Sequence, residues 1–316
     1  MVRRVIFLFS EGDTPLNADS LDQFAGLEER YIETNGIRLH AVSAGPQEGD
    51  VVILLHGFPD FWRGWINQIG PLAQAGFRVL APDQRGYNLS DKPKGVGAYD
   101  LDALAGDVLG IIQSTGQSKV HLVGHDWGAA VAWHTAIQYP EMIDKLVILN
   151  VPHPDIMQQT LMGSLSQLKM SWYIFYFQIP WLPETSISLR NFSGGVSALQ
   201  HSGKPATFSN ADIAAYQEAW SRPGAMTGMI NWYRAVFRRS LRSGLDAQRL
   251  PPRPVPVPTL VLWGKDDIAL SLEMAQPSLD LCAEGKLVLF DDASHWVQRD
   301  CANEVNQEMI TFLRGD

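Results

Sequence analysis

The sequence of 316 residues has few cysteines, no strongly basic segment and no long apolar run, and each scarcity excludes a class of protein. Two cysteines, Cys282 and Cys301, cannot form a disulfide framework, which favours a reducing compartment and predicts a cytoplasmic protein. The net charge is −9 and no basic run is longer than Arg238-Arg239, so we expect no nucleic-acid partner. No segment approaches the roughly 20 apolar residues that a membrane span needs. We therefore expect a chain that does not span a membrane and is long enough to bury a sizeable core.

The N-terminal residues suggest a targeting segment only faintly. Met1–Phe9 combines two arginines with a short apolar run, but Glu11 and Asp13 follow at once and no small-residue cleavage site is present. We interpret residues 1–27 as an N-terminal extension.

Six short apolar runs predict strands that are buried on both faces, because they are apolar throughout instead of alternating. They cover residues 51–55, 77–81, 119–123, 145–150, 259–263 and 286–290. Helical periods lie between them, such as the stripe from Leu101 to Ile112 that Gly116 closes. Before them, two runs flank Asn35-Gly36, a strong hairpin signal. The pattern predicts an α/β fold, with a mostly parallel sheet flanked by helices and a hairpin at one edge.

This alternation stops between about residues 151 and 250. That stretch is rich in aromatic residues and methionines, and it is helical in pieces without a clear buried strand. It ends at the proline-rich run Pro251–Pro258, which cannot continue a helix. We expect residues 28–150 and 251–316 to form one core domain, and residues 151–250 to form an inserted helical cap.

A candidate nucleophile lies between the third of these strands and a following helix. The run Val120–Val123 enters Gly124-His125-Asp126-Trp127-Gly128, and an alanine-rich segment leaves it. This strand–elbow–helix pattern presents a nucleophile in α/β-hydrolases, where serine is the usual central residue. A carboxylate is ionised at neutral pH, so Asp126 could attack an electrophilic carbon without a base to remove a proton. The alternative is that Asp126 only caps the following helix.

The ends of two later strands supply partners for this nucleophile. His295 follows the sixth strand, and Asp266 and Asp267 follow the fifth. Because open α/β sheets place active sites at the carboxyl ends of strands, we predict His295 as the base, oriented by Asp267 or Asp266. The turn His56-Gly57-Phe58-Pro59 follows the first parallel strand, where an oxyanion loop is expected. We predict the backbone N–H groups of Phe58 and Trp127 as oxyanion donors.

Together these motifs resemble the epoxide hydrolases of the α/β-hydrolase fold. The resemblance rests on His-Gly-Phe-Pro at 56–59, Gly-His-Asp-Trp-Gly at 124–128 and Asp-Ala-Ser-His-Trp at 292–296, and it extends from about residue 28 to 314. It implies that an epoxide and water become a vicinal diol through an ester on Asp126, without a metal or an organic cofactor. The family's Gly-x-x-Asp spacing selects Asp267 as the acid. The sequence departs from the family at Asn88, where a second glycine is common, and asparagine tolerates the positive φ that such a loop needs.

The resemblance also implies roles for two tyrosines of the predicted cap. Tyr173, in Trp172–Gln178, and Tyr233, in Asn231-Trp232-Tyr233-Arg234, are similar to the family's ring-opening tyrosines. A phenol stays protonated at neutral pH and can donate a hydrogen bond to a developing alkoxide. Tyr176 is a nearby rival for Tyr173, and plain packing of the cap is the alternative for both.

We expect a small lipophilic epoxide to bind between the sheet and the cap of a monomer or a homodimer. The predicted pocket is lined by the side chains of His56, Phe58, Pro59, Trp127, His153, Trp172, Phe177, Trp181 and Trp296.

Three other functions use parts of the same pattern. A haloalkane dehalogenase has the same elbow aspartate and following tryptophan, but it needs a halide cradle, and Phe58 has no side-chain donor for one. Fluoroacetate dehalogenases place arginine where Trp127 stands, and an esterase would need a serine in place of Asp126. A ligand receptor without catalysis is the alternative from another class, because fold alone does not establish activity.

Overall fold

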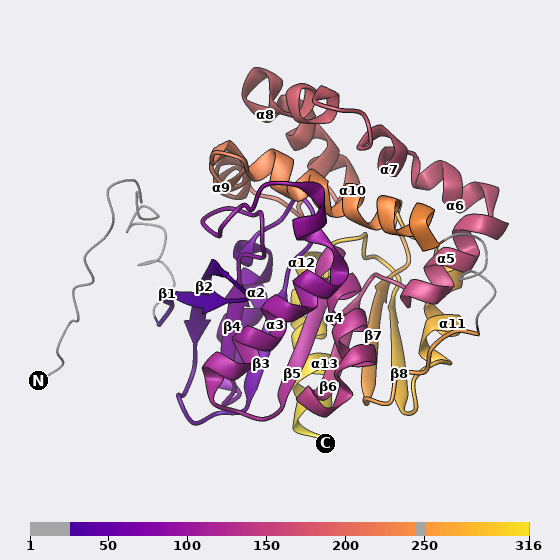
Figure 1. Cartoon of the computed structure of the whole chain (residues 1–316). Coiled ribbons are helices and arrows are strands. Elements are labelled where there is room, and N and C mark those ends of the chain that lie inside the picture. Colours follow the sequence, from indigo (N-terminus) through magenta and orange to yellow (C-terminus); the bar gives the residue numbers. More distant parts are fainter. Residues whose placement is uncertain (1–25, 244–250, 316) are drawn as a thin grey trace, which may run out of the picture.

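The computed structural model describes residues 26–243 and 251–315, and an eight-stranded sheet forms its centre (Figure 1). The strand order is β1-β2-β4-β3-β5-β6-β7-β8. β2 pairs antiparallel with both β1 and β4, and all later neighbours are parallel. The strands are β1 (Glu28–Thr34), β2 (Ile37–Ala44), β3 (Val51–Leu55), β4 (Arg78–Pro82), β5 (Val120–His125), β6 (Ile143–Leu149), β7 (Thr259–Gly264) and β8 (Gly285–Phe290).

The predicted strands and the hairpin at Asn35-Gly36 are confirmed. β3, β4, β5 and β7 are buried along their whole length, as continuous apolar runs require. The prediction was wrong for β8, which is largely exposed, with Leu289 41% exposed. β8 forms the edge of the sheet and pairs with β7 alone among the described strands, so part of it stays exposed to solvent. The apolar run did not indicate that this strand lies at an edge.

Helices cover both faces of the sheet (Figure 1). α3 and α4 pack against each other on one face, and α2 and α13 pack against each other on the opposite face. α3 ends at Gly116, whose φ of 79° lies in the left-handed region. The helical elements of the core are η1 (Trp62–Trp65), α2 (Ile66–Gln74), η2 (Val96–Tyr99), α3 (Leu101–Thr115), α4 (Trp127–Gln138), η3 (Pro140–Met142), η5 (Leu272–Met274), α11 (Ala275–Leu279), α12 (Val297–Asp300) and α13 (Ala302–Arg314).

Only helices lie between β6 and the end of α10 (Ala225–Ser243), and they stand above the carboxyl ends of the strands (Figure 1). We call them the cap helices: α5 (Pro154–Gly163), α6 (Leu165–Met170), α7 (Trp172–Tyr176), α8 (Leu182–Ser202), α9 (Asn210–Ser221) and α10. The chain returns to the sheet through the proline-rich run, where Val255 bridges to Cys282. Residues 1–25 of the predicted extension, and residues 244–250 at the predicted cap boundary, lie outside the described residues.

Across residues 26–243 and 251–315, no helix is long and apolar enough to cross a membrane.

Candidate active site

Asp126 occupies a strained turn between β5 and α4. Its φ of 50° and ψ of −125° are rare for a residue with a side chain, and it makes no capping hydrogen bond to α4. The neighbouring glycines allow the turn, because a Cβ on Gly128 would lie 2.0 Å from the carbonyl oxygen of Leu55 and one on Gly124 2.5 Å from that of Gly128. The geometry is that of a residue presented by the backbone at the end of a strand, and a helix cap does not explain it.

The carboxylate of Asp126 lies between a backbone amide and a histidine. The N–H of Phe58 donates to Oδ1 at 2.6 Å, and Nε2 of His295 lies 3.5 Å from Oδ2. Burial raises the pKa of Asp126, but the hydrogen bond and the charge of His295 outweigh it, so the pKa is lowered overall. Asp126 is therefore ionised and aligned in the resting site.

His295 is held from its other ring nitrogen by Asp267. Nδ1 of His295 lies 2.8 Å from Oδ2 of Asp267, whose Oδ1 accepts from the amides of Ala269 and Leu270 at 2.7 and 3.0 Å. Burial lowers the pKa of His295, but the carboxylates of Asp267 and Asp126 raise it to about 10. Asp266 instead pairs with Lys204 at the surface. Of the two aspartates, Asp267 is the one that orients the imidazole.

Two side chains outside the predicted set support this histidine. Asn150 follows β6 with a φ of 55° and donates to Oδ2 of Asp267 at 2.8 Å. His125 places Nε2 2.7 Å from the carbonyl oxygen of His295. Burial and the charge of His295 lower the pKa of His125 to about 3, so its ring is neutral and donates this bond. A polar residue at the end of each parallel strand was the available signal for both.

Tyr173 on α7 and Tyr233 on α10 approach each other above Asp126. Their ring centroids are 5.8 Å apart, and the Tyr233 ring also contacts Phe58 at 5.2 Å and Trp127 at 4.9 Å. Burial raises the pKa of both phenols, and the negative charge of Asp126 raises it further. Both hydroxyl groups are therefore protonated. The rival Tyr176 turns away and bonds through its hydroxyl to Ser186 at 2.5 Å.

The chain is similar in sequence to known hydrolases. Residues 50–178 match the family model of the alpha/beta hydrolase fold. Epoxide hydrolase 4 of Homo sapiens is 37% identical, with 90% of this chain and 78% of that protein covered, and epoxide hydrolase A of Mycobacterium tuberculosis is 32% identical over 91% and 97%. The chain belongs to the α/β-hydrolase-fold epoxide hydrolase family.

Other relatives agree with this family. The AB hydrolase superfamily protein YfhM of Bacillus subtilis is 44% identical over 92% of this chain and 99% of that protein. The solved structure of an epoxide hydrolase from Bacillus megaterium with an inhibitor superposes with a TM-score of 0.81, at 32% identity, over 90% of this chain and 100% of that one. The predicted α/β-hydrolase fold, with helices inserted in a mostly parallel sheet, is thus confirmed, and the family is one of hydrolases.

The three cap aromatics predicted to line the pocket differ in their exposure to solvent. Phe177 packs on Phe58 with ring centroids 5.4 Å apart and on Tyr233 at 4.8 Å. Trp172 and Trp181, predicted to line a pocket between the sheet and the cap, are 63% and 80% exposed. Tyr173 and Phe177, at the C-cap of α7, point inward on the same side of this helix, so Trp172 lies on the outer side of α7. The sequence alone did not show which aromatic face of this helix is buried.

Of the four other predicted lining residues, His56, His153 and Trp296 are buried and Pro59 is partly buried, all in supporting positions. His56 accepts from the amide of Gln84 at 3.0 Å, and its own carbonyl accepts from the Gln84 side chain. The carbonyl of Pro59 accepts from the indole N–H of Trp220 at 2.6 Å. His153 packs on Trp133 and accepts from the amide of Asp155, and Trp296 contacts the ring of His125 and donates to Ser202. These contacts give the four residues a part in holding the loops around the site.

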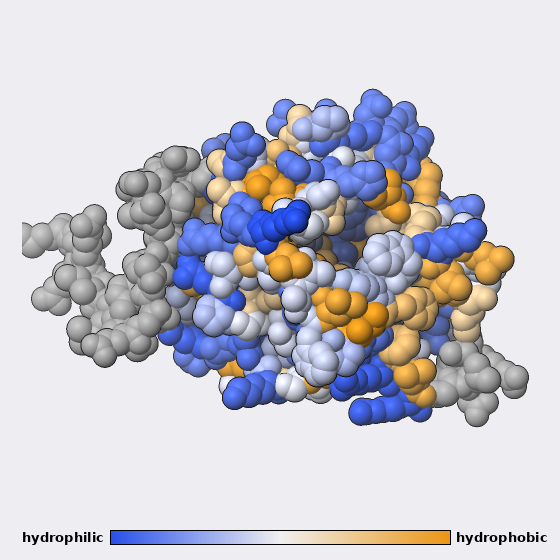
Figure 2. Space-filling model, turned by 90° about the horizontal axis from the view of Figure 1, so that it is seen from above, coloured by the Kyte–Doolittle hydropathy of each residue, from blue (hydrophilic) through white to orange (hydrophobic). Residues whose placement is uncertain are grey.

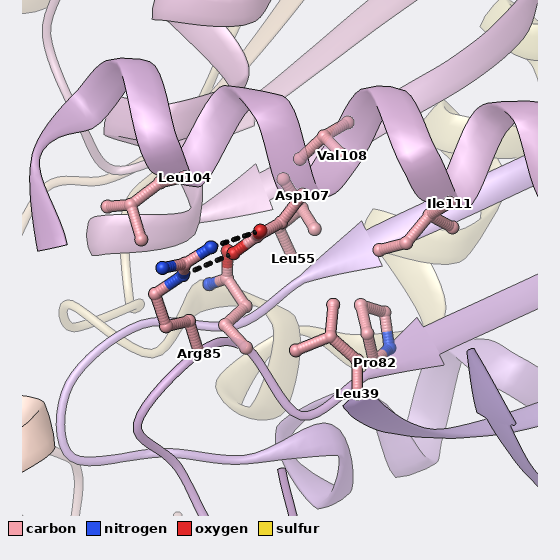
Figure 3. Close-up of a pocket in the computed structure, with 9 residues that line it drawn as sticks. Leu39, Leu55, Pro82, Arg85, Leu104, Asp107, Val108 and Ile111 are labelled. Atoms are coloured by element: carbon pink, nitrogen blue, oxygen red, sulfur yellow. Dashed lines mark hydrogen bonds and ion pairs between the residues drawn. The ribbon is translucent and has the colours of Figure 1, made fainter. Parts of the chain in front are cut away.

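The loop after β4 joins the core to α10. Figure 3 shows Arg85 reaching Asp107 of α3 through two hydrogen bonds of 2.7 and 2.6 Å, beside a small cavity lined by apolar side chains. The carbonyl of Arg85 accepts from the indole N–H of Trp232 at 3.0 Å. Next to it, the loop and α10 meet so closely that a Cβ on Gly228 would lie 2.6 Å from the carbonyl oxygen of Gly86. This contact fixes the height of α10 above the strand ends.

Proposed function

We propose that this protein hydrolyses a small lipophilic epoxide to a vicinal diol through a covalent ester on Asp126. The observation that carries the proposal is the pairing of an ionised, strained carboxylate with two protonated phenols. One group can form a bond to carbon while the others donate to the oxygen that leaves. The family to which the chain belongs supports the same reaction.

In the first step, a carboxylate oxygen of Asp126 attacks a ring carbon of the epoxide. A carbon–oxygen bond to Asp126 forms and the ring carbon–oxygen bond breaks. Tyr173 and Tyr233 donate hydrogen bonds to the epoxide oxygen, and one of them transfers its proton as the ring opens. Two donors share the developing charge, which a single phenol would stabilise less well.

In the second step, His295 accepts a proton from water, and the resulting hydroxide attacks the ester carbonyl. Esterification removes the charge of Asp126, one of the two carboxylates that raise the pKa of His295, so the ring passes its proton to the tyrosinate left by ring opening and becomes the neutral base. The amides of Phe58 and Trp127 hold the oxyanion. Collapse of the intermediate releases the diol and the Asp126 carboxylate, and the proton taken from water stays on His295 and restores its resting ion pair with Asp126.

A haloalkane dehalogenase is the runner-up, because the first step would use the same aspartate. Its leaving halide would have to be bound beside the ester of Asp126 by side-chain donors. Phe58 offers none, and the nearby Tyr173 and Tyr233 are suited to an oxygen that needs a proton.

Oxygen labelling tests the covalent route. With enzyme in excess over an aryl epoxide in heavy-oxygen water, the first diol should carry the unlabelled oxygen of Asp126, and the label should appear in the protein. Prompt label in the diol would refute the ester in favour of direct attack by water.

A side-by-side assay on aryl epoxides and haloalkanes tests the substrate class. The Asp126→Ala variant should lose turnover, and Asp292→Asn, which changes an exposed carboxylate near His295, should keep it. Turnover of haloalkanes but not of epoxides would contradict the proposal. Binding of either substrate without turnover would instead support a ligand receptor without catalysis.

A further inference from the structure

Arg234 of α10 is buried beside Tyr233 and binds two other segments of the cap. It is 8% exposed. Its Nε donates to the carbonyl of Phe177 at 2.9 Å, and a terminal nitrogen donates to the carbonyl of Ile179 at 3.0 Å. Both terminal nitrogens bind the carboxylate of Glu184, at 2.5 and 3.1 Å. One guanidinium therefore connects α10, the turn after α7 and the first turn of α8.

These partners are ones that an isolated helix end would leave unsatisfied. α7 is only five residues long, so the carbonyls of Phe177 and Ile179 lie beyond its own hydrogen-bonding pattern. Glu184 is nearly buried, and its carboxylate is neutralised by the same guanidinium. Arg234 thus supplies the donors that end α7 and begin α8 in a fixed relation to α10.

The same connection joins the two tyrosines. The amide of Phe177 donates to the carbonyl of Tyr173 at 2.9 Å, so the carbonyl that Arg234 binds belongs to the same helical turn as Tyr173. Tyr233 precedes Arg234 on α10. Between them, the Phe177 ring lies 6.0 Å from the Tyr173 ring and 4.8 Å from the Tyr233 ring. The separation of the two phenols therefore depends on how closely Arg234 draws α7 to α10.

We propose that Arg234, held by Glu184, is a positioning residue that sets the separation of the Tyr173 and Tyr233 hydroxyls for ring opening. This inference rests on the proposed function and extends it to a residue that does not touch the substrate. Two donors serve one oxygen only if both reach it together, and a displacement of about 1 Å in such a group can cost about 100-fold in rate. The planar fork of arginine holds two carbonyls and a carboxylate at once, which the point charge of lysine cannot do.

The test separates formation of the ester from its hydrolysis. In rapid-quench experiments on the full chain with an aryl epoxide, Arg234→Lys should slow ester formation by about 10- to 100-fold. Hydrolysis of the ester, which uses His295 and not the tyrosines, should change less than about twofold. Lysine keeps the charge beside Glu184, so the variant is expected to fold, and thermal unfolding together with titration of active sites checks this.

Arg239→Lys is the matched control. Arg239 lies on the same helix and binds Asp100 and Asp102 of the core, at 2.5 and 2.9 Å, without reaching α7. Its conservative replacement should leave both steps near the wild-type rates. If Arg234→Lys slowed both steps equally, slowed neither, or behaved as Arg239→Lys does, the positioning role would be refuted.

Combination with Tyr233→Phe shows whether Arg234 acts through the phenol. If it does, adding Arg234→Lys to Tyr233→Phe should slow ester formation much less than it does in the wild type. If the two substitutions instead slowed ester formation by the product of their separate effects, Arg234 would have a general structural role and the proposal would be overturned. If Tyr173→Phe and Tyr233→Phe both formed ester at the wild-type rate, the proposed ring-opening chemistry would itself fail, and the positioning role with it.

Discussion

The core and the cap hold their parts of the site by different means. Asp126, Asp267 and His295 follow the parallel strands β5, β7 and β8, and short hydrogen bonds to backbone amides or side chains fix each of them. Tyr173 and Tyr233 lie on helices and contact mainly the edges and faces of other aromatic rings. The ionised side chains of the core are thus positioned by strand ends and hydrogen bonds, and the neutral phenols of the cap are positioned by the packing of aromatic rings.

The two regions also differ in how much apolar surface they leave to solvent. The strands β3 and β5 contain no exposed residue, whereas the cap exposes Leu165 and Trp181 at 78% and 80%. Figure 2, which views the molecule from above, shows apolar residues gathered at several places on this side. A tightly packed core allows one arrangement of its groups, while the more open cap depends on a few specific contacts such as those of Arg234.

Removal of the core base should have the largest effect. His295→Gln should still form the ester but hydrolyse it about 1,000- to 10,000-fold more slowly, because general base catalysis of water attack is lost. Mass spectrometry should then detect a protein heavier by the mass of the substrate. Asp126→Ala, the control, should show no such increase. If His295→Gln turned over at the wild-type rate, the core would not supply the base.

Removal of one cap donor should have a smaller effect, confined to the first step. Tyr173→Phe or Tyr233→Phe alone should slow ester formation by about 100-fold, since one donor to the leaving oxygen remains. Stopped-flow measurement of a single turnover gives this rate. Tyr176→Phe is the matched control on the same helix and should stay near the wild type. Wild-type activity in the Tyr173→Phe, Tyr233→Phe double variant would contradict the epoxide assignment and favour the dehalogenase.

The smallest effect should appear in the pH dependence of stability. The folded-state pKa of His295 is raised to about 10, above its ordinary value near 6.5, so its stabilising contribution is complete below pH 6.5 and is lost as pH rises towards 10. Denaturant unfolding between these pH values should show a weaker pH dependence for His295→Gln than for the wild type.

Two comparisons isolate this contribution. His40 is also buried, but Asp83 and Glu29 raise its pKa to about 9, so it adds a similar loss that persists in His295→Gln. Tyr173→Phe should keep the wild-type dependence below pH 10, because burial raises the phenol's pKa above that range. Equal slopes for the wild type and His295→Gln would show that the histidine is not held as an ion pair in the folded core.

The sequence predicted the core far better than the cap, for a physical reason. Strand ends and glycine turns are local patterns, so the positions of Asp126 and His295 and the positive φ of Asn88 could be read from a few residues. The burial of a cap aromatic depends on which side of its helix meets the core, and this is why the exposure of Trp172 was not predicted. The position of Asn150 after a strand was visible in the sequence, but its contact with Asp267 joins residues 117 apart in the chain and was not.

The way in which the cap enters the sheet has a consequence for how such enzymes diversify. β6 and β7, the strands before and after the cap helices, are direct neighbours in the sheet, with Leu146 opposite Thr259. The insertion therefore interrupts the sequence without interrupting the order of strands. Exchange of this one segment would replace Tyr173 and Tyr233 and leave Asp126, His295 and the loop at Phe58 unchanged. Modularity of this kind lets selection act on substrate scope separately from bond formation.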